Sequence, residues 1–186
     1  MHPSAYVAPT AVLCGDVRIE ADARVLFGAV ITAEDESVHV GARCVVMEQS
    51  IIRARAGHPV VLGDDVLVGP HAHLNGTHVS EGAFLATGCA LFPGSRIGRA
   101  AEIRIHGVVH VNTVIEDHGL VPIGWVAVGD PARILAPDRH QDIWEVQAML
   151  DFPGTVYGVS REASPGERMT RQARWFGEHR SDRVLG

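Results

Sequence analysis

The chain has 186 residues, of which 46% are hydrophobic and 5% are aromatic, and it carries a formal net charge of −6. Its arginines are scattered rather than clustered, so the basic stripe expected of a nucleic-acid-binding protein is missing, and we expect no DNA or RNA partner. The first residues show no secretory leader pattern and no apolar run is long enough to span a bilayer, so we predict a cytoplasmic protein without a membrane partner.

Aliphatic residues recur at a period of six along most of the chain. The series begins at Val7, Leu13 and Ile19, and it ends at Val109 and Ile115. Four positions after most of these aliphatics stands a small residue. Neither an α-helix nor simple strand alternation has a period of six. The pattern therefore predicts an all-β fold, a parallel β-helix in which the aliphatic fills the centre of each triangular coil and the small residue fits where the wall turns inward.

The period is interrupted at three places. Nine residues separate the aliphatics at 31 and 40, ten separate those at 52 and 62, and five separate those at 74 and 79. We predict that a loop leaves the coil at each of the two longer intervals. The first loop carries the acidic segment 34–36, and the second carries Arg53, Arg55 and His58. Loops on a rigid scaffold commonly hold functional residues, so these two segments are candidates for a site.

The three cysteines do not have a spacing typical of a metal or redox motif. Cys44 and Cys89 fall on the inward, small-residue positions and are predicted to fill the core. Cys14 follows the inward Leu13 and is predicted to be exposed. We therefore expect no thiol chemistry.

The tail changes character after the repeat. Pro and Gly in segment 122–133 predict a closing cap, and the apolar spacing of Ile143, Val146 and Leu150 predicts a first helix lying along the coil. Segment 151–159 is expected to be extended. The sequence Ser-Pro-Gly-Glu at 164–167 has the form of a capping box and predicts a second helix through about residue 180. We accordingly divide the chain into a β-helix at 1–135 and a C-terminal helical extension at 136–186.

Several segments resemble the γ-class carbonic anhydrase-like branch of left-handed β-helix proteins: 40–53, 62–76 with its shortened hexad, and 128–133. The resemblance covers about residues 5 to 135. It implies a left-handed parallel β-helix that assembles as a homotrimer, with zinc at each subunit interface held by three histidines. Carried over hexad by hexad, those ligand positions fall on Arg53, Pro70 and Asn75. Proline offers no ligand atom and a guanidinium repels a divalent cation, so we predict that zinc and CO₂ hydration are lost at that position.

A rebuilt site can be placed on neighbouring residues. His71, His73 and Asn75 stand at alternate positions of one predicted strand, so His71 and His73 are candidate zinc ligands. The Arg53 guanidinium suits a carboxylate or phosphate, which points to a small anionic substrate. Glu48 is a candidate general base, so the predicted catalytic residues are Glu48, Arg53 and Asn75. The alternative is that the histidines only form hydrogen bonds and that the arginines pair with Glu48 or with the acidic segment 34–36 across a subunit interface.

Three functions remain open at this stage. The first is an enzyme with the rebuilt interfacial site, acting on a small anionic or acyl substrate. The second is a coenzyme-A-dependent acyltransferase, because such hexapeptide-repeat enzymes end in a cap like the Gly-Asp-Pro-Ala-Arg of 129–133. The third is a non-catalytic assembly or binding module.

Overall fold

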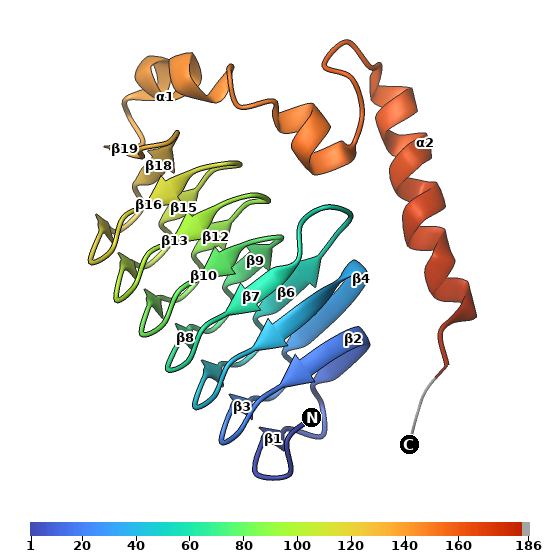
Figure 1. The fold of residues 1–186 in the computed structure, drawn as a ribbon. Coiled ribbons are helices and arrows are strands. Elements are labelled where there is room, and N and C mark those ends of the chain that lie inside the picture. The colour runs from blue at the N-terminus through green and yellow to red at the C-terminus, as the bar shows by residue number, and fades with distance from the viewer. Residues whose placement is uncertain (184–186) are drawn as a thin grey trace.

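The structure is a computed structural model, and it describes residues 1–183. The chain winds into a stack of coils with three walls (Figure 1). One wall of the stack is a seven-stranded parallel sheet: β1 (Tyr6–Val7), β3 (Arg24–Val25), β5 (Val45–Val46), β8 (Leu67–Val68), β11 (Phe84–Leu85), β14 (Glu102–Ile103) and β17 (Leu120–Val121). The predicted all-β, left-handed β-helix with C-terminal helices is confirmed.

The other two walls form one 12-stranded sheet because β2 (Val12–Ile19) and β4 (Val30–Val40) run from one wall into the next. The second wall continues with β6 (Ile51–Ala54), β9 (His73–Asn75), β12 (Ala90–Leu91), β15 (Val108–Val109) and β18 (Val126–Val128). The third continues with β7 (Val60–Leu62), β10 (His78–Val79), β13 (Arg96–Ile97) and β16 (Val114–Ile115). An antiparallel strand, β19 (Arg133–Leu135), closes the stack against β18.

The strand register reproduces the interruptions of the sequence repeat. Val7 pairs with Val25, so three hexads make one coil. In the next two coils Val25 pairs with Val46 and Val46 pairs with Val68. These coils are longer than three hexads because each contains one of the two longer intervals. Val68 pairs with Leu85, one residue short of three hexads, which reflects the shortened hexad.

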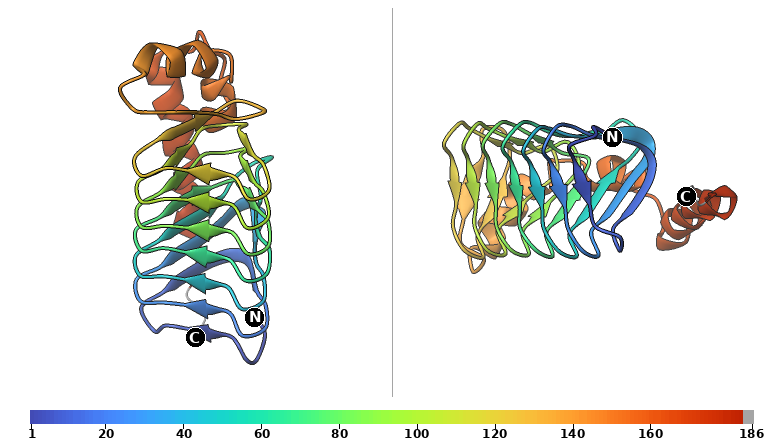
Figure 2. Two further views of the ribbon diagram at one scale, coloured as in Figure 1. Left: turned by 90° about the vertical axis from the view of Figure 1, so that its left-hand side faces the viewer. Right: turned by 90° about the horizontal axis from the view of Figure 1, so that it is seen from below.

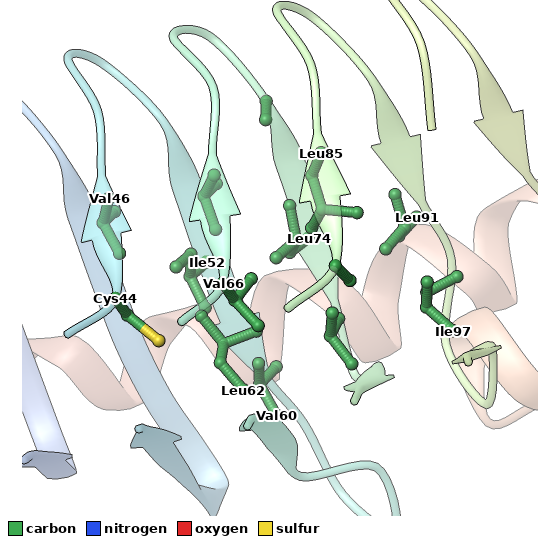
Figure 3. Packing of buried hydrophobic residues seen from close by; sticks show 14 of the residues in the cluster. Cys44, Val46, Ile52, Val60, Leu62, Val66, Leu74, Leu85, Leu91 and Ile97 are labelled. Carbon is green, nitrogen blue, oxygen red and sulfur yellow. The ribbon is translucent and has the colours of Figure 1, made fainter. Parts of the chain in front are cut away.

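The periodic aliphatics form one continuous core inside the stack (Figure 3). Ile52, Leu74 and Leu91 lie one above another on the second wall and are at most 1% exposed. Cys44 and Cys89 are fully buried, as predicted for core residues. Burial of each large aliphatic contributes about 1.5–3 kcal/mol, so the stability of the stack accumulates coil by coil.

The first predicted loop is wrong and the second is confirmed. Residues 32–39 stay within the single strand β4, because its first half pairs with β6 and its second half with β7. Asp35 takes a positive φ of 61° in that strand. Between β6 and β7 the chain does leave the coil, and Arg55 and His58 exchange backbone hydrogen bonds of 3.1 and 2.7 Å across the loop.

The tail begins with helix α1 (His140–Gln147), which packs against β18 at the C-terminal end of the stack rather than along the coils (Figure 1). The expectation of an extended segment at 151–159 is wrong. Residues Pro153–Tyr157 form a π-helical turn, because the Asp151 carboxylate accepts the Gly154 N–H at its start and Gly158 adopts the left-handed conformation at its end.

Helix α2 (Pro165–Phe176) has the predicted capping box and ends before residue 180, in a 3₁₀ turn at Gly177–Ser181. It runs back beside the stack toward the N-terminal coils (Figures 1 and 2). Residues 184–186 of the predicted extension lie outside the described part. None of the helices in residues 1–183 is long and apolar enough to cross a membrane.

Candidate functional site

One column of outward side chains on the second wall contains two of the inherited ligand positions. Each member directly follows one of the periodic aliphatics, and we call the set the outer column. Its members, from the N-terminal coil upward, are Cys14, Thr32, Arg53, Asn75, Phe92 and His110. The C-terminal tail covers this column, through residues of α1, the π-helical turn and α2.

Arg53 occupies the outer column with both a charge partner and an aromatic partner. Its Nε lies 3.2 Å from Oε1 of Glu34, whose side chain is only 8% exposed. Its Cζ lies 5.1 Å from the centre of the Phe176 ring, a cation–π distance. Arg53 therefore pairs with the acidic segment 34–36 of its own chain.

The residues at the inherited zinc positions do not fit a zinc ion. Asn75 pairs in register with Arg53 on the neighbouring strand and is 9% exposed. Pro70 lies at a different corner, where it lines a groove with Met47 and Ile105. The side chains at these positions are the guanidinium of Arg53, the amide of Asn75 and the ring of Pro70. They do not supply the imidazole, thiolate or carboxylate donors that zinc requires.

The other predicted site residues lie near the Pro70 corner. His71 has a positive φ of 57°, is exposed, and donates its backbone N–H to the Glu48 carbonyl at 3.1 Å. His73 lies in β9 with an exposed side chain, and partial desolvation by its neighbours and then the charge of Arg53 lower its pKa. Within residues 1–183 no hydrogen bond or ion pair joins the Glu48 side chain to either histidine. The roles of these residues stay predictions.

A cleft opens between the β6–β7 loop, the π-helical turn and α2, and we call it the arginine cleft. Its volume is about 300 Å³. The side chains that matter for its chemistry are Arg55, His58, Tyr157, Arg171, Arg174 and Trp175. Arg55 is 7% exposed and its Cζ lies 4.5 Å from the Trp175 ring centre. The loop predicted from the sequence as functional thus forms one side of this cleft.

Positive charge in the arginine cleft is not fully neutralised. Within residues 1–183 no carboxylate forms an ion pair with the guanidinium of Arg55, Arg171 or Arg174, although Asp35 and Glu178 also line the cleft. Burial lowers the pKa of Arg55, but a guanidinium stays protonated in proteins. The cleft therefore presents one buried guanidinium, Arg55, and two exposed ones, Arg171 and Arg174, and guanidinium groups that converge in this way can bind an anion.

A glycine makes room for one of these arginines. Gly158 has a positive φ of 62°, and a Cβ there would lie 3.0 Å from Nη2 of Arg171. The left-handed backbone favours glycine at this position, and any larger residue would also push the Arg171 side chain aside. The spacing of Arg171 and Arg174 on one helix could have pointed to this surface, but the sequence alone does not show which face of α2 meets the loop.

His110, at the C-terminal end of the outer column, contacts the tail. Its ring stacks on Phe92 and contacts Phe152, with centroid distances of 5.8 and 5.5 Å. Its Nε2 lies 2.6 Å from the side-chain nitrogen of Gln147 in α1. Burial lowers the pKa of His110 to about 4, so the imidazole is neutral at pH 7.

Comparison with known proteins supports the family resemblance. No family model matches the chain. The chain is 29% identical over 169 residues to gamma carbonic anhydrase 1, mitochondrial, of Arabidopsis thaliana, covering 88% of this chain and 58% of that protein. It is 24% identical over 144 residues to a carbonic anhydrase of Geobacillus kaustophilus, covering 77% and 76%. The chain spans 50 to 59% of the length of the first three curated relatives.

Solved structures support the fold. A Bacillus cereus protein with an acetyltransferase assignment is 22% identical, with a TM-score of 0.54, covering 84% of this chain and 89% of that one. A hexapeptide transferase family protein of Anaplasma phagocytophilum is 19% identical, with a TM-score of 0.51, covering 79% and 83%. The class is thus the left-handed hexapeptide-repeat β-helix. Within that class the sequence relatives confirm the predicted resemblance to the γ-carbonic anhydrase-like family.

Proposed function

We propose that this protein is a homotrimeric, cytoplasmic γ-carbonic anhydrase-like protein that binds a small organic anion in the arginine cleft and does not hydrate CO₂ at the inherited zinc position. The observation that carries the proposal is the set of three guanidinium groups, Arg55, Arg171 and Arg174, that line one cleft without a paired carboxylate in residues 1–183. A carboxylate or phosphate is the ligand group that such donors bind best.

The size of the cleft favours a ligand larger than bicarbonate. A volume of about 300 Å³ is at the lower end of the range for small-molecule pockets, and a four-atom anion would fill a small part of it. Trp175 and Tyr157 add apolar surface beside the charged groups. A compact organic acid or phosphate ester, with one anionic group and a short carbon body, matches both properties.

An exposed apolar face supports the homotrimer. Large apolar side chains that remain exposed on or beside the seven-stranded wall are Phe27, Phe84, Ile105, Leu120 and Ile123. The groove beside them contains Pro70, one of the three inherited ligand positions. Burying such a face against a second copy is favourable, because exposed apolar patches on proteins usually mark contact surfaces. Analytical ultracentrifugation tests this part, and a monomer at micromolar concentration would contradict it.

The predicted catalytic set also belongs to this proposal. In a trimer, the corner with Glu48 and His71 of one copy would face the outer column of the next. Glu48 would then act as general base, Arg53 and Asn75 would orient the substrate, and zinc would bind His71 and His73. Metal analysis of untagged protein and of a His71→Ala, His73→Ala double variant tests the zinc ligands. Unchanged zinc content in the variant would exclude them.

The anion site is tested by calorimetric titration with inorganic phosphate, acetate and bicarbonate. An Arg171→Gln, Arg174→Gln double variant should weaken binding of phosphate at least tenfold, because a hydrogen bond to a charged group contributes about 1.5–3 kcal/mol. The matched control is Arg96→Gln, which removes an exposed arginine of β13 away from the cleft. Equal affinity in the double variant and the control would contradict the proposal.

Acetyl-coenzyme A in the same titration addresses the acyltransferase alternative. The solved structures of that class share less than a quarter of their residues with this chain, so they support the fold alone. Tight binding of acetyl-coenzyme A would replace the present proposal with that alternative.

A non-catalytic assembly module is the second candidate, and one observation favours it. Arg53 lies between Glu34 of β4 and Phe176 of α2, a pair of contacts that joins the tail to the coils without any ligand. If no ligand binds and the trimer dissociates in the His71→Ala, His73→Ala variant, this candidate becomes the better account.

A further inference from the structure

The last described residues bring three metal-binding side chains together at the first coils. Sγ of Cys14 in β2 lies 3.3 Å from Oδ2 of Asp182, and that oxygen lies 2.8 Å from Nδ1 of His179. All three donor atoms lie within 4.8 Å of one another. Within residues 1–183 this is the one group of three or more such side chains that is close enough to share an ion.

The spacing and chemistry of the three donors suit zinc. Zinc bonds of about 2.0–2.3 Å in tetrahedral array place neighbouring donor atoms about 3.3–3.8 Å apart. The distances of 2.8 and 3.3 Å become compatible with this geometry after sub-ångström movements of exposed side chains. Thiolate, imidazole and carboxylate are the three ligand types that zinc accepts. Three protein ligands leave one coordination position open to solvent.

Glu34 is an independent observation at the same place. Its side chain is 8% exposed, both carboxylate oxygens are buried, and neither has a hydrogen-bond partner in the described residues. Oε1 lies 3.5 Å from Nε2 of His179, on the opposite side of the ring from Nδ1. Zinc-bound histidines typically direct their second nitrogen to a carboxylate, which fixes the tautomer with Nδ1 free to bind the metal. Glu34 stands where that carboxylate is expected.

We infer that Cys14, His179 and Asp182 form a zinc site, with Glu34 as the carboxylate that positions His179. The charges balance: one zinc ion offsets one thiolate and one carboxylate, and Arg53 offsets Glu34 at 3.2 Å. Binding releases the Cys14 thiol proton to solvent and changes no oxidation state. The site is separate from the inherited zinc position and does not depend on the proposed anion binding.

Zinc at this site would fasten the tail to the first coil. Cys14 belongs to β2, whereas His179 and Asp182 lie just after α2, so the ion connects segments that are 165 residues apart in sequence. Because α2 also supplies Arg171 and Arg174, zinc binding would hold one side of the arginine cleft in place.

The test is titration of the untagged full chain with Co²⁺ and Zn²⁺. The expected result is one equivalent of Co²⁺ with a thiolate-to-cobalt charge-transfer band, and displacement of Co²⁺ by Zn²⁺. The Cys14→Ser variant should lose the band, and Glu34→Gln should weaken zinc affinity about 10–100-fold. His118→Gln, which removes an exposed histidine at a distant corner, should change neither.

A second measurement is independent of the cobalt spectrum. Limited trypsin digestion should cut the tail several-fold more slowly with Zn²⁺ than with a chelator in the wild type, and equally fast in both for Cys14→Ser. The inference is overturned if folded wild-type protein shows no thiolate–cobalt band. It is also overturned if Cys14→Ser keeps its zinc while the His71→Ala, His73→Ala variant loses it.

Discussion

Acidification should destabilise this protein through His110. The ring lies between Phe92 and Phe152 under the tail, its Nδ1 is buried without a hydrogen-bond partner in the described residues, and it is 5% exposed. Protonating it in the folded state would place a charge among aromatic rings. The unfolded chain has no such restriction, so it takes up the proton first as the pH falls.

The size of the effect follows from the two pKa values. Burial lowers the pKa of His110 from 6.5 to about 4 in the folded state. Because the folded pKa lies below the unfolded one, the stability is complete above pH 6.5 and declines as the pH falls from 6.5 to 4. One pKa unit corresponds to about 1.4 kcal/mol, so the full loss is about 3 kcal/mol and the loss between pH 7 and pH 4.5 is about 2 kcal/mol.

The assay is urea unfolding at pH 7 and pH 4.5, at one fixed protein concentration so that association does not vary. The matched control is His110→Gln, which can still bond to the Gln147 amide but does not titrate. Carboxylates change the stability of both proteins by the same amount, so the difference between the two pH-induced losses isolates His110. If wild type and His110→Gln lose equal free energy, the buried neutral imidazole is the wrong description.

Three further changes test other contacts. Arg53→Met should lower the free energy of unfolding by about 2 kcal/mol, because the Glu34 carboxylate stays buried without its cation. Adding Glu34→Gln should restore most of this loss, as measured by urea unfolding. No recovery in the double variant would argue against the ion pair. Leu74→Ala should cost about 3 kcal/mol and lower the melting temperature, since the side chain is fully buried in the central stack. Ser164→Ala should destabilise α2 by about 1 kcal/mol by removing its capping box, seen as faster proteolysis of the tail; unchanged proteolysis would contradict that assignment.

The coils could be predicted because most hexads repeat the same pattern, a large aliphatic followed four positions later by a small residue. Aliphatic residues that recur at every sixth position, such as Ile52 and Leu74, can all be buried together when they point into the stack. The loop at 55–58 was predictable for the same reason, since its extra residues cannot fit a coil. The segment 32–39 was misread because the length of an interval does not tell whether neighbouring strands pair on both sides of it. Here β2 pairs with both halves of β4, while β6 pairs with its first half and β7 with its second.

The candidate site could be predicted only in part. Arg53 and Asn75 each directly follow a periodic aliphatic and pair in register, so their alignment follows from the period. The aromatic partner of Arg53, Phe176, comes from the tail, and α2 has no buried residue from which its docking could be predicted. Cys14 and His179 showed no recognisable motif in sequence, because their proximity depends on the whole path of the tail across the stack. Pro and Gly in 153–158 indicated a break, whereas the actual π-helical turn depends on Asp151 and Gly158.

The central claim is that the inherited zinc position no longer holds a metal. A crystal structure of untagged protein grown with zinc, with anomalous scattering recorded at the zinc absorption edge, tests it most directly. The account predicts no anomalous peak within about 2.3 Å of any side-chain atom of Arg53, Pro70 or Asn75. A peak bonded to one of these three residues would contradict it.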